Sequence, residues 1–314
     1  MKNNKIICIV GPTASGKTAL SIKLAKALSG EIISGDSMQI YKGMDIGTAK
    51  PTTDEMDGVV HHMLSIVSPW ESYSAARYVE DASAIADDIL SRGKIPIVVG
   101  GTGLYIDSLV RGRQFAKNEE DLTLRRELFE LYEKSGADAV HDILKELDPV
   151  RAEQIHKNNV KRVIRAIEVF KMTGKTISEH DEESKKEPPK YDAAYVGILY
   201  ENREELYERI NLRVDMMVKD GLLDEVKALL DGGVSPDSTA MQAIGYKELT
   251  AYFENKKTLE EALEDIKASS RRYAKRQMTW FKRNESIKWV KPPLSESFPE
   301  LLQYLINFTS HTGV

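Results

Sequence analysis

Residues 5–18 read KIICIVGPTASGKT, and this stretch decides the fold. Its first part, Lys5–Val10, is a short β-branched run of the kind that forms a buried parallel strand. Its second part, Gly11–Thr18, matches the pattern G-x-x-x-x-G-K-[ST] of a phosphate-binding P-loop. Residues 19–28 then carry leucines and alanines at helical spacing. A strand, a glycine-rich loop and a helix in this order predict a P-loop core.

The loop residues are of the types that hold a polyphosphate. Its glycines let backbone N–H groups close around phosphate oxygens, and the following helix adds the partial positive charge of its N-terminus. The Lys17 ammonium reaches a terminal phosphate, and the Thr18 hydroxyl is a candidate Mg²⁺ ligand. The candidate phosphate-binding residues are Gly11, Pro12, Thr13, Ala14, Ser15, Gly16, Lys17 and Thr18. The motif predicts a polyphosphate ligand and leaves the reaction open.

Further runs extend the α/β pattern and then interrupt it. Strands are expected at residues 31–34 and 94–99 and a helix at 73–90, an alternation that predicts a parallel, doubly wound sheet. From residue 113 strand-like runs disappear for about eighty residues, until a strand at 194–199 rejoins the sheet. We therefore expect a P-loop NTPase-like parallel sheet flanked by helices in residues 1–112 and 193–314. An all-helical insertion is expected in residues 113–192.

Apolar spacing predicts helices in both halves of the remaining chain. The insertion has three such patterns, followed by a charged stretch, residues 181–190, that ends in Pro188-Pro189 and is interpreted as a linker or exposed loop. After the strand at 194–199, helices are expected at residues 203–230, 241–252 and 259–281.

Bulk composition narrows the class of protein. The 314 residues are 41% hydrophobic and 30% charged, which is ordinary for a globular chain, and the net charge of −5 gives no hint of nucleic acid. Cys8, in an apolar run, is the one cysteine, so a disulfide framework is excluded and a reducing compartment fits. The polar N-terminus and the short apolar run after it predict no signal peptide or membrane span. We expect a cytoplasmic protein.

Polar residues follow two of the expected strands. Asp36 lies in SGDSMQ (34–39), and Thr102 lies in GGTGLY (100–105). Because the carboxyl ends of parallel strands line the ligand crevice, we expect Asp36 and Thr102 to converge near the P-loop. Kinases and ATPases of this class usually place a Mg²⁺-binding aspartate after such a strand, where this chain has glycines. A carboxylate at position 36 can bind metal, hold a lid or accept a proton.

A basic, aromatic helix is predicted near the C-terminus. Residues 270–283, SRRYAKRQMTWFKR, hold six cations and no acid. A solvated charged face would mix signs, whereas a cationic ridge beside aromatic rings suits phosphates and unstacked bases. Ala274, Met278 and Phe281 share another face of this helix and are expected in the core.

Three weaker signals leave alternatives open. The basic residues in 157–165 have acids nearby, so they form either a binding surface or a solvated face. His61 and His62 are adjacent in an extended segment and point opposite ways, so a metal pair is not expected. Arg209 and Arg213 lie one helical turn apart, and they either reach the phosphates or form surface ion pairs with Glu205 or Asp215.

The chain resembles the tRNA dimethylallyltransferase (tRNA isopentenyltransferase) family in motifs spread over nearly its whole length. The long run GDSMQIYKGMDIGTAKP (35–51) is the most specific of them. The others occur in family order and at family-like spacing: GPTASGKT (11–18), GGTGLY (100–105), RVIRAIEV (162–169), QAIGYKE (242–248) and RRYAKRQMTWF (271–281). The insertion is more variable in character, so the resemblance says less about it.

This resemblance implies a fold, a reaction and partners. The P-loop core is related to nucleotide kinases, and the insertion grips the tRNA anticodon stem-loop. A dimethylallyl group passes from dimethylallyl diphosphate to the exocyclic N6 amine of the adenosine 3′-adjacent to the anticodon, and diphosphate is released. Mg²⁺ is the implied cofactor, and a monomer that needs no membrane is expected. Members are often described as ATP-binding, although the chemistry uses the prenyl diphosphate.

The resemblance also implies roles for individual residues. Asp36 is the general base, with Lys17 and Thr102 as further catalytic residues, and Arg213 helps Gly11–Thr18 to hold diphosphate. The implied tRNA-binding residues are Asp36, Ser37, Met38, Gln39, Thr102, Arg125, Lys161, Arg162, Val163, Ile164, Arg165, Gln242, Ala243, Ile244, Gly245, Tyr246, Lys247, Lys275, Arg276, Gln277, Met278, Thr279, Trp280, Phe281 and Lys282.

Three other functions are weighed against this one. A small-molecule kinase or ATPase would transfer phosphoryl groups from ATP and would not need the basic ridge at 271–283. A prenyltransferase acting on free adenine nucleotides would need neither the ridge nor the large insertion. A non-catalytic P-loop RNA-binding protein would bind tRNA without prenyl transfer.

Overall fold

The computed structural model describes residues 4–113, 115 and 122–310. The chain divides into two compact units, one formed by Met1–Gly112 with Lys190–Val314 and the other by Arg113–Pro189. The chain re-enters the first unit at Lys190, three residues before the boundary at residue 193 that the sequence predicted. Lys190 and Tyr191 already bind Asp87 of the first unit, at 2.8 and 2.7 Å.

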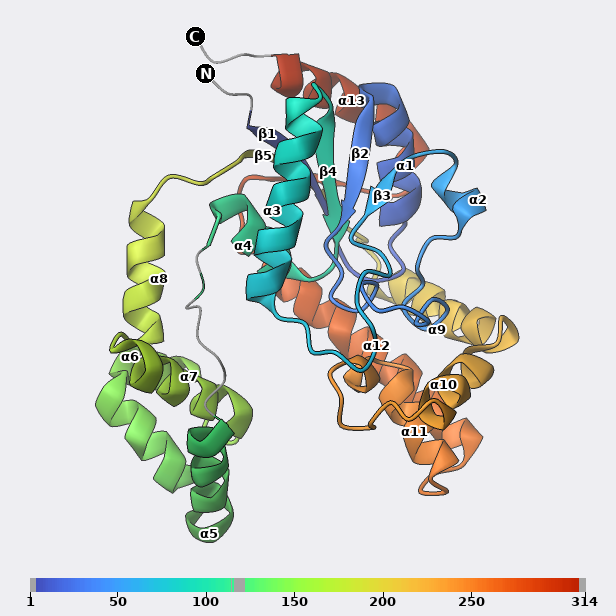
Figure 1. The fold of residues 1–314 in the computed structure, drawn as a ribbon. Coiled ribbons are helices and arrows are strands. Elements are labelled where there is room, and N and C mark those ends of the chain that lie inside the picture. Colours follow the sequence, from blue (N-terminus) through green and yellow to red (C-terminus); the bar gives the residue numbers. More distant parts are fainter. Residues whose placement is uncertain (1–3, 114, 116–121, 311–314) are drawn as a thin grey trace. The chain divides into compact units, whose positions relative to one another are not determined.

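A six-stranded sheet forms the centre of the first unit (Figure 1). Neighbouring strands pair in parallel throughout. Ile7, Cys8 and Ile9 of the central strand are fully buried, which explains why its sequence shows no polar alternation. The predicted parallel sheet is confirmed. Its strand order is β3 (His61–His62), β2 (Gly30–Ser34), β4 (Ile95–Gly100), β1 (Lys5–Val10), β5 (Asp192–Ile198) and β6 (Ile287–Val290).

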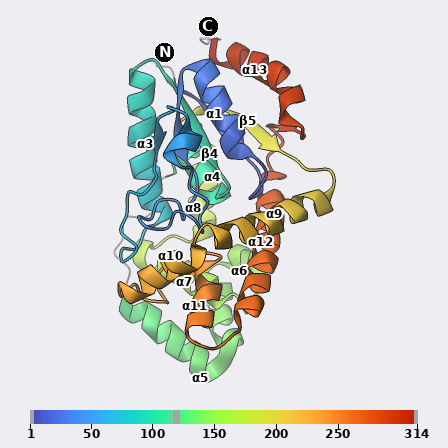
Figure 2. The same ribbon diagram turned by 90° about the vertical axis from the view of Figure 1, so that its right-hand side faces the viewer.

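Helices cover both faces of this sheet. Figure 2 shows α3 (Ala75–Ser91) on one side and α1 (Lys17–Leu28) with α13 (Leu294–Ser310) on the other. The α1 and α13 side chains join the sheet residues in one apolar core cluster. On the opposite face α3 packs against α4 (Gly103–Arg111), where the rings of Tyr78 and Tyr105 stack with centroids 4.2 Å apart.

Four helices lie beyond the carboxyl ends of the strands, where a P-loop fold binds its ligand (Figure 1). They are α9 (Arg203–Lys219), α10 (Leu222–Asp231), α11 (Tyr246–Phe253) and α12 (Leu259–Phe281). Two shorter elements, α2 (Thr53–Met56) and the 3-10 turn Ala240–Gln242, lie in the connections. In the described part of the chain, no helix combines the length and the apolar character that a membrane crossing requires.

The C-terminal half differs from the sequence expectations in two ways. The single helix predicted over 203–230 is two helices, because Gly221 has a φ of +103° and the chain turns there between α9 and α10. Strand β6 and helix α13 follow the last helix that the sequence predicted. The four residues of β6 are too few to distinguish a strand from a helix by spacing alone, and Pro299 interrupts the helical pattern of α13.

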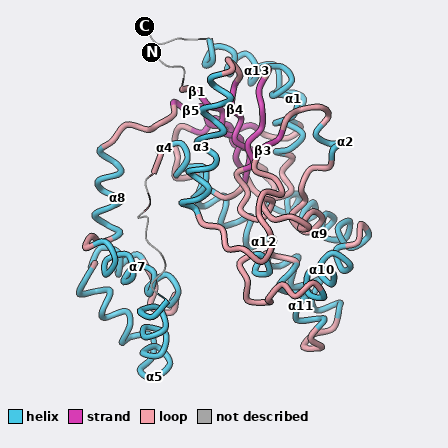
Figure 3. Tube along the Cα trace, in the orientation of Figure 1, coloured by secondary structure: helices cyan, strands magenta, loops and turns pink. Residues whose placement is uncertain are grey.

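The second unit contains only helices among its described residues (Figure 3). They are α5 (Leu122–Leu147, broken at Gly136), α6 (Pro149–Gln154), α7 (Val160–Thr173) and α8 (Ile177–Lys186). Buried residues such as Leu144 and Ile167 give this unit its own core. The loop predicted over 181–190 is wrong for residues 181–186, because Thr176 and Glu179 form a capping box that starts α8 just before them.

A buried carboxylate holds one edge of the sheet. Glu31 of β2 has a side chain only 3% exposed, and it binds the Arg92 guanidinium at 2.5 and 2.8 Å and the Lys94 ammonium at 2.7 Å. The hydrogen bond from Arg92 is the main reason that the pKa of Glu31 lies far below its usual range, with Lys94 and His62 adding to it.

This arrangement predicts an acid-dependent loss of stability. The Glu31 carboxylate stays charged in the folded protein below pH 4, whereas in the unfolded chain it takes up a proton near its ordinary pKa of about 4.3. Its stabilisation is therefore complete above about pH 5 and is lost as the pH falls towards the folded-state pKa. We expect Glu31→Gln to cost about 2 kcal/mol at neutral pH and to flatten the acid limb of a plot of unfolding free energy against pH. The control is Glu80→Gln on the exposed face of α3, and equal acid limbs in both variants would contradict the prediction.

Candidate active site

The P-loop joins β1 to α1 through two glycines in unusual conformations. Gly11 has a φ of +146° and Gly16 a φ of +93°, values that L side chains rarely adopt. A Cβ on Gly11 would also lie 3.2 Å from the carbonyl oxygen of Ile198 on the neighbouring strand β5. Beside this loop lies a cavity of about 770 Å³, lined by Thr13 to Ala19 on one side and by α9 on the other.

Lys17 is held in this cavity as a poorly compensated cation. Its Nζ donates to the carbonyl oxygens of Gly11 at 3.0 Å and Pro12 at 2.6 Å. Burial, and after it the nearby Arg213, lower the pKa of Lys17 to about 7, although Asp36 partly opposes both effects. A bound anion would restore the favourable charge balance, as expected for a phosphate-binding lysine.

Two arginines of α9 complete the positive side of the cavity. Arg209 Nε donates to the carbonyl oxygen of Ala14 at 3.1 Å, and Arg213 Nη1 lies 3.5 Å from Thr13 Oγ1. Burial lowers the pKa of Arg213, against the attraction of Asp36. Of the two alternatives that the sequence left open, the structure favours contact with the P-loop, since Asp215 pairs with Lys267 at 2.9 Å.

Asp36 and Thr102 come together at the ends of β2 and β4. The Thr102 hydroxyl accepts a hydrogen bond from the Ser37 amide at 3.1 Å, and the Thr102 amide donates to Gly35 O at 3.2 Å. This approach needs a glycine at position 100, because a Cβ there would lie 2.2 Å from Gly35 O. The Asp36 carboxylate accepts from the Met38 amide at 2.8 Å, which fixes it in a turn at the cavity wall.

A second cavity of about 280 Å³ adjoins the first and shares Thr13, Asp36 and Arg213 with it. Part of its lining is polar and includes Ser37 and Arg276. The rest is apolar and comes from Ile210, Val214, Met217, Leu222, Ala243, Ile244 and Ile266. A phosphate loop, a carboxylate and a small apolar pocket therefore meet in one place, which suits a diphosphate ester of a short hydrocarbon.

Helix α12 closes the site through Gln277. This side chain is 4% exposed, and it accepts from the Thr13 amide at 2.8 Å and donates to Gly101 O at 3.2 Å. A Cβ on Gly101 would lie 1.9 Å from Gln277 Nε2, and one on Gly103 would lie 2.2 Å from Trp280 Cδ1. The glycines of GGTGL thus let α12 approach β4 and α4 closely.

The predicted ridge on α12 is exposed only in part. Lys275, Arg276, Thr279 and Lys282 face solvent, and Trp280 is 37% exposed while its Nε1 donates to Asp107 at 2.7 Å. Ala274 and Phe281 are buried as expected, and Met278 is half-buried. Gln277, expected among RNA contacts, instead points inward, and it shares its buried face with Ala274 and Phe281 at helical spacing.

Comparisons with known proteins agree with this geometry. A family model described as IPP transferase matches residues 39–284, and one described as isopentenyl transferase matches residues 4–65. A tRNA dimethylallyltransferase of Acetivibrio thermocellus is 48% identical over 311 residues, 99% of each chain. The chain belongs to the tRNA dimethylallyltransferase family.

Solved structures of family members support the fold. The tRNA isopentenylpyrophosphate transferase of Bacillus halodurans is 43% identical, with a TM-score of 0.72 over 98% of this chain and 97% of the other. A eukaryotic dimethylallyltransferase, solved while acting on tRNA, is 35% identical with a TM-score of 0.81, and the match covers 97% of this chain and 78% of the other. Prenyl transfer is therefore the chemistry of this family.

The residues that the family resemblance implied for tRNA binding differ in solvent exposure. On α7, Lys161, Arg162 and Arg165 are exposed, whereas Val163 and Ile164 are buried in the core of the insertion and present no side chain to a partner. Arg125 binds the buried Glu168 at 2.6 and 2.9 Å.

The implied segment 242–247 divides in the same way. Gln242 and Lys247 are exposed, Ile244 is half-buried, and Ala243, Gly245 and Tyr246 are buried. Gln242, Ala243, Ile244 and Gly245 also line the smaller cavity.

Sequence reasoning missed Tyr273. It lines both cavities, and its hydroxyl contacts the Thr102 and Gln277 side chains. Burial, together with the nearby Asp36, raises its pKa to about 12, so it is a hydrogen-bond donor at neutral pH. Its position one turn before Gln277 was the signal that could have found it.

The two adjacent histidine rings contact different partners. His61 Nδ1 contacts Val59 O, and His62 Nε2 contacts Glu31. Across the described residues, no group of three or more His, Cys, Asp or Glu side chains is placed to hold a metal.

The pKa of about 7 for Lys17 predicts pH-dependent anion binding. Above pH 7 the free protein loses this proton, so binding of inorganic pyrophosphate must recover it and weakens by up to about tenfold per pH unit. Calorimetric titration from about pH 6 to about pH 9 measures this slope. We expect Lys17→Met to bind weakly with a flatter profile, and Lys23→Met, on the exposed face of α1, to match the wild type. Parallel profiles for wild type and Lys17→Met would contradict the assignment.

Proposed function

We propose that this protein transfers a dimethylallyl group from dimethylallyl diphosphate to the N6 amine of the adenosine 3′-adjacent to the anticodon of tRNA. The observation that carries the proposal is the position of Asp36, a residue that lines both the phosphate-loop cavity and the adjoining apolar cavity. An acceptor amine at Asp36 would lie beside a prenyl diphosphate held by the P-loop.

The donor must become the reactive partner, because the adenine amine is a poor nucleophile whose lone pair is delocalised into the ring. Lys17, Arg213 and the amides at the start of α1 stabilise the charge that develops on the departing diphosphate. The allylic carbon then takes on cationic character as its bond to oxygen breaks. The P-loop in this proposal holds a leaving group instead of a phosphoryl group in transfer.

Asp36 acts on the other partner. Its carboxylate orients the adenine amine and takes up the proton released as the new carbon–nitrogen bond forms. The Met38 amide fixes the carboxylate, and the Thr102 hydroxyl fixes the adjoining Ser37 amide. A stacked adenine cannot reach this depth, so the base leaves the anticodon-loop stack and enters the site.

Exposed cations supply the contacts to the RNA backbone. They lie on α12 (Lys275, Arg276, Lys282), on the insertion helix α7 (Lys161, Arg162, Arg165) and at Lys247. The insertion, residues 113–189 in the structure, is proposed to grip the anticodon stem-loop. Contacts of this kind make tRNA affinity strongly dependent on salt.

A divalent cation fits the site as a companion of the diphosphate. Mg²⁺ prefers oxygen ligands and is commonly held by one or two protein oxygens together with phosphates. The exposed Thr18 hydroxyl, which lines the larger cavity, is the protein oxygen that would hold it here together with the diphosphate. When bound, the ion would neutralise charge on the diphosphate.

Two further expectations from the sequence stay predictions: that the protein is a monomer and that it is located in the cytoplasm.

Removing the Asp36 carboxylate tests the assigned base. We expect Asp36→Ala to lower turnover by about 10²-fold, the usual scale for losing a general base, while tRNA affinity is largely retained. Single-turnover kinetics with saturating donor, alongside tRNA binding by filter retention, measure the two effects. The control is Asp54→Ala, an exposed acid on α2. A variant with near-normal turnover would remove Asp36 from the mechanism.

The reaction itself is tested by product analysis. The protein is mixed with Mg²⁺, dimethylallyl diphosphate and unmodified tRNA, and the nucleosides are analysed by mass. We expect prenylated adenosine only when the prenyl donor is present. Phosphoryl transfer from labelled ATP to nucleoside monophosphates would favour a kinase. Prenylation of free adenine nucleotides in preference to tRNA would favour the second alternative, and tight tRNA binding without transfer would favour a non-catalytic protein.

A further inference from the structure

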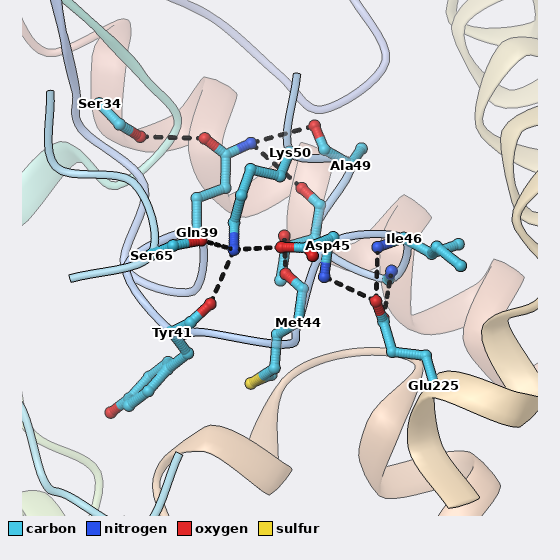
Figure 4. Close-up of polar contacts among 12 residues, drawn as sticks. Ser34, Gln39, Tyr41, Met44, Asp45, Ile46, Ala49, Lys50, Ser65 and Glu225 are labelled. Atoms are coloured by element: carbon cyan, nitrogen blue, oxygen red, sulfur yellow. Dashed lines mark hydrogen bonds and ion pairs between the residues drawn. The ribbon is translucent and has the colours of Figure 1, made fainter. Parts of the chain in front are cut away.

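A carboxylate of α10 is bound by three consecutive backbone amides. Glu225 Oε2 accepts from the amides of Asp45 at 2.7 Å and Ile46 at 2.8 Å, and Oε1 accepts from the Gly47 amide at 3.0 Å (Figure 4). The Tyr246 hydroxyl donates to the same carboxylate at 2.5 Å. These amides belong to the segment 35–51, which begins with the Asp36 turn. Glu225 lies 180 residues after Asp45 in sequence, and it is not among the residues assigned to the reaction.

The Tyr246 ring fits against the same segment. It is fully buried, and a Cβ on Gly47 would lie 2.5 Å from it, so only glycine allows this contact. Helices α10 and α11 thus hold residues 45–47 from one side, through a charge and through packing.

A lysine holds the segment from within. Lys50 has a side chain 7% exposed, and its Nζ donates to Tyr41 O at 2.7 Å, to Ser65 Oγ at 2.7 Å and to Asp45 Oδ1 at 2.5 Å (Figure 4). Glu225 binds backbone donors of the segment, whereas Lys50 binds backbone and side-chain acceptors. The Glu225 carboxylate and the Lys50 ammonium together satisfy polar groups of residues 41–47 that have no partner within regular secondary structure.

The clamped residues connect directly to the catalytic turn. The Gln39 side-chain amide donates to the carbonyl oxygens of Thr48 at 3.2 Å and Ala49 at 3.1 Å, and its oxygen accepts from Ser34 Oγ at 3.0 Å. The Gln39 backbone amide lies 3.4 Å from the Asp36 carboxylate. Gly47 and Thr48 also line the smaller cavity beside Asp36.

We infer that Glu225 is a positioning residue, which through the amides of residues 45–47 holds the 35–51 segment in the shape that sets Asp36 against the acceptor base. The inference deepens the proposed function and rests on it for its kinetic readout. Tyr246 shares this carboxylate and directly follows residues 242–245, which line the smaller cavity. Glu225 therefore holds both this part of the cavity wall and the segment that carries Asp36.

The Glu225→Gln variant tests this role with little change of volume. The glutamine side chain keeps one oxygen acceptor, but its NH2 group replaces the other oxygen and cannot accept a hydrogen bond. One or two of the three backbone N–H groups of residues 45–47 are then left without a partner. Tyr246→Phe is a milder second variant that removes only the shared hydroxyl. Asp231→Asn is the control, because Asp231 is an exposed acid of the same helix and pairs with Lys227 at 2.7 Å.

Three measurements separate positioning from a general structural effect. Because a displacement of about 1 Å can cost 10²-fold, we expect Glu225→Gln to lower turnover by about tenfold or more. Pyrophosphate affinity should be largely retained, because Lys17 and Arg213 are held by contacts with the P-loop itself, although residues 45–50 line the same cavity. In an Asp36→Ala background the same substitution should cost less than about twofold, because the carboxylate that it positions is gone. Hydrogen exchange of the 40–50 region should quicken in Glu225→Gln and not in Asp231→Asn.

Each outcome bears on the inference. Unchanged exchange in the 40–50 region would overturn the clamp, whether or not the protein transfers prenyl groups. Equal losses of turnover with and without Asp36, or a parallel loss of pyrophosphate affinity, would overturn its positioning role. If Glu225→Gln does not fold, Tyr246→Phe carries the same tests with a smaller expected effect. A wild-type protein without prenyl transfer but with the expected exchange pattern would overturn the proposed function and retain the clamp.

Discussion

The site depends on an excess of buried positive charge next to one carboxylate. Burial disfavours the charge of both Lys17 and Arg213, Arg213 adds to this effect on Lys17 and Arg209 adds to it on Arg213, and Asp36 only partly compensates them. Such an arrangement is costly in an empty cavity and favourable once an anion enters. This requirement explains why α9 contributes Arg209 and Arg213 to a loop that lies almost two hundred residues before them.

A phosphate loop serves different chemistry according to the residues at the ends of the neighbouring strands. In this chain β4 ends at Gly100 and is followed by Gly101, and these glycines let Gly35 and Gln277 approach closely. The carboxylate comes instead from Asp36, after the end of β2. Asp36 therefore faces an apolar cavity, with Thr102 and Tyr273 around it. In the proposed reaction, the hydrocarbon that leaves its diphosphate lies there beside the Asp36 carboxylate. The reaction class depends on this neighbourhood, and the P-loop alone does not determine it.

Local patterns were enough to predict much of the core. The apolar run at residues 5–10 and the GxxxxGKT motif gave β1, the P-loop and α1, because a buried parallel strand and a phosphate loop each have a short-range signature. The convergence of Asp36 and Thr102 came from a rule about strand ends. Helix α8 was not predicted, because the charged stretch and its double proline are typical of a loop. The Thr176–Glu179 capping box just before it is the local signal for a helix start.

The roles of Gln277 and Glu225 depend on contacts between distant parts of the chain, which no local sequence pattern predicts. Gln277 looked like part of a basic surface, but its side chain bonds the Thr13 amide, 264 residues away. Glu225 was an ordinary acid in an amphipathic helix until the structure placed the amides of residues 45–47 against it. Both residues are polar groups that satisfy backbone atoms of distant loops, and sequence spacing gives no measure of that.

A structure of the protein with an unreactive thio analogue of dimethylallyl diphosphate and an unmodified anticodon stem-loop would test the proposed chemistry most directly. We expect the diphosphate against Lys17 and the P-loop amides, the prenyl carbons in the apolar cavity, and the everted adenine with its amine within hydrogen-bonding distance of Asp36. A donor bound away from Lys17, or an Asp36 carboxylate turned from the adenine amine, would contradict it.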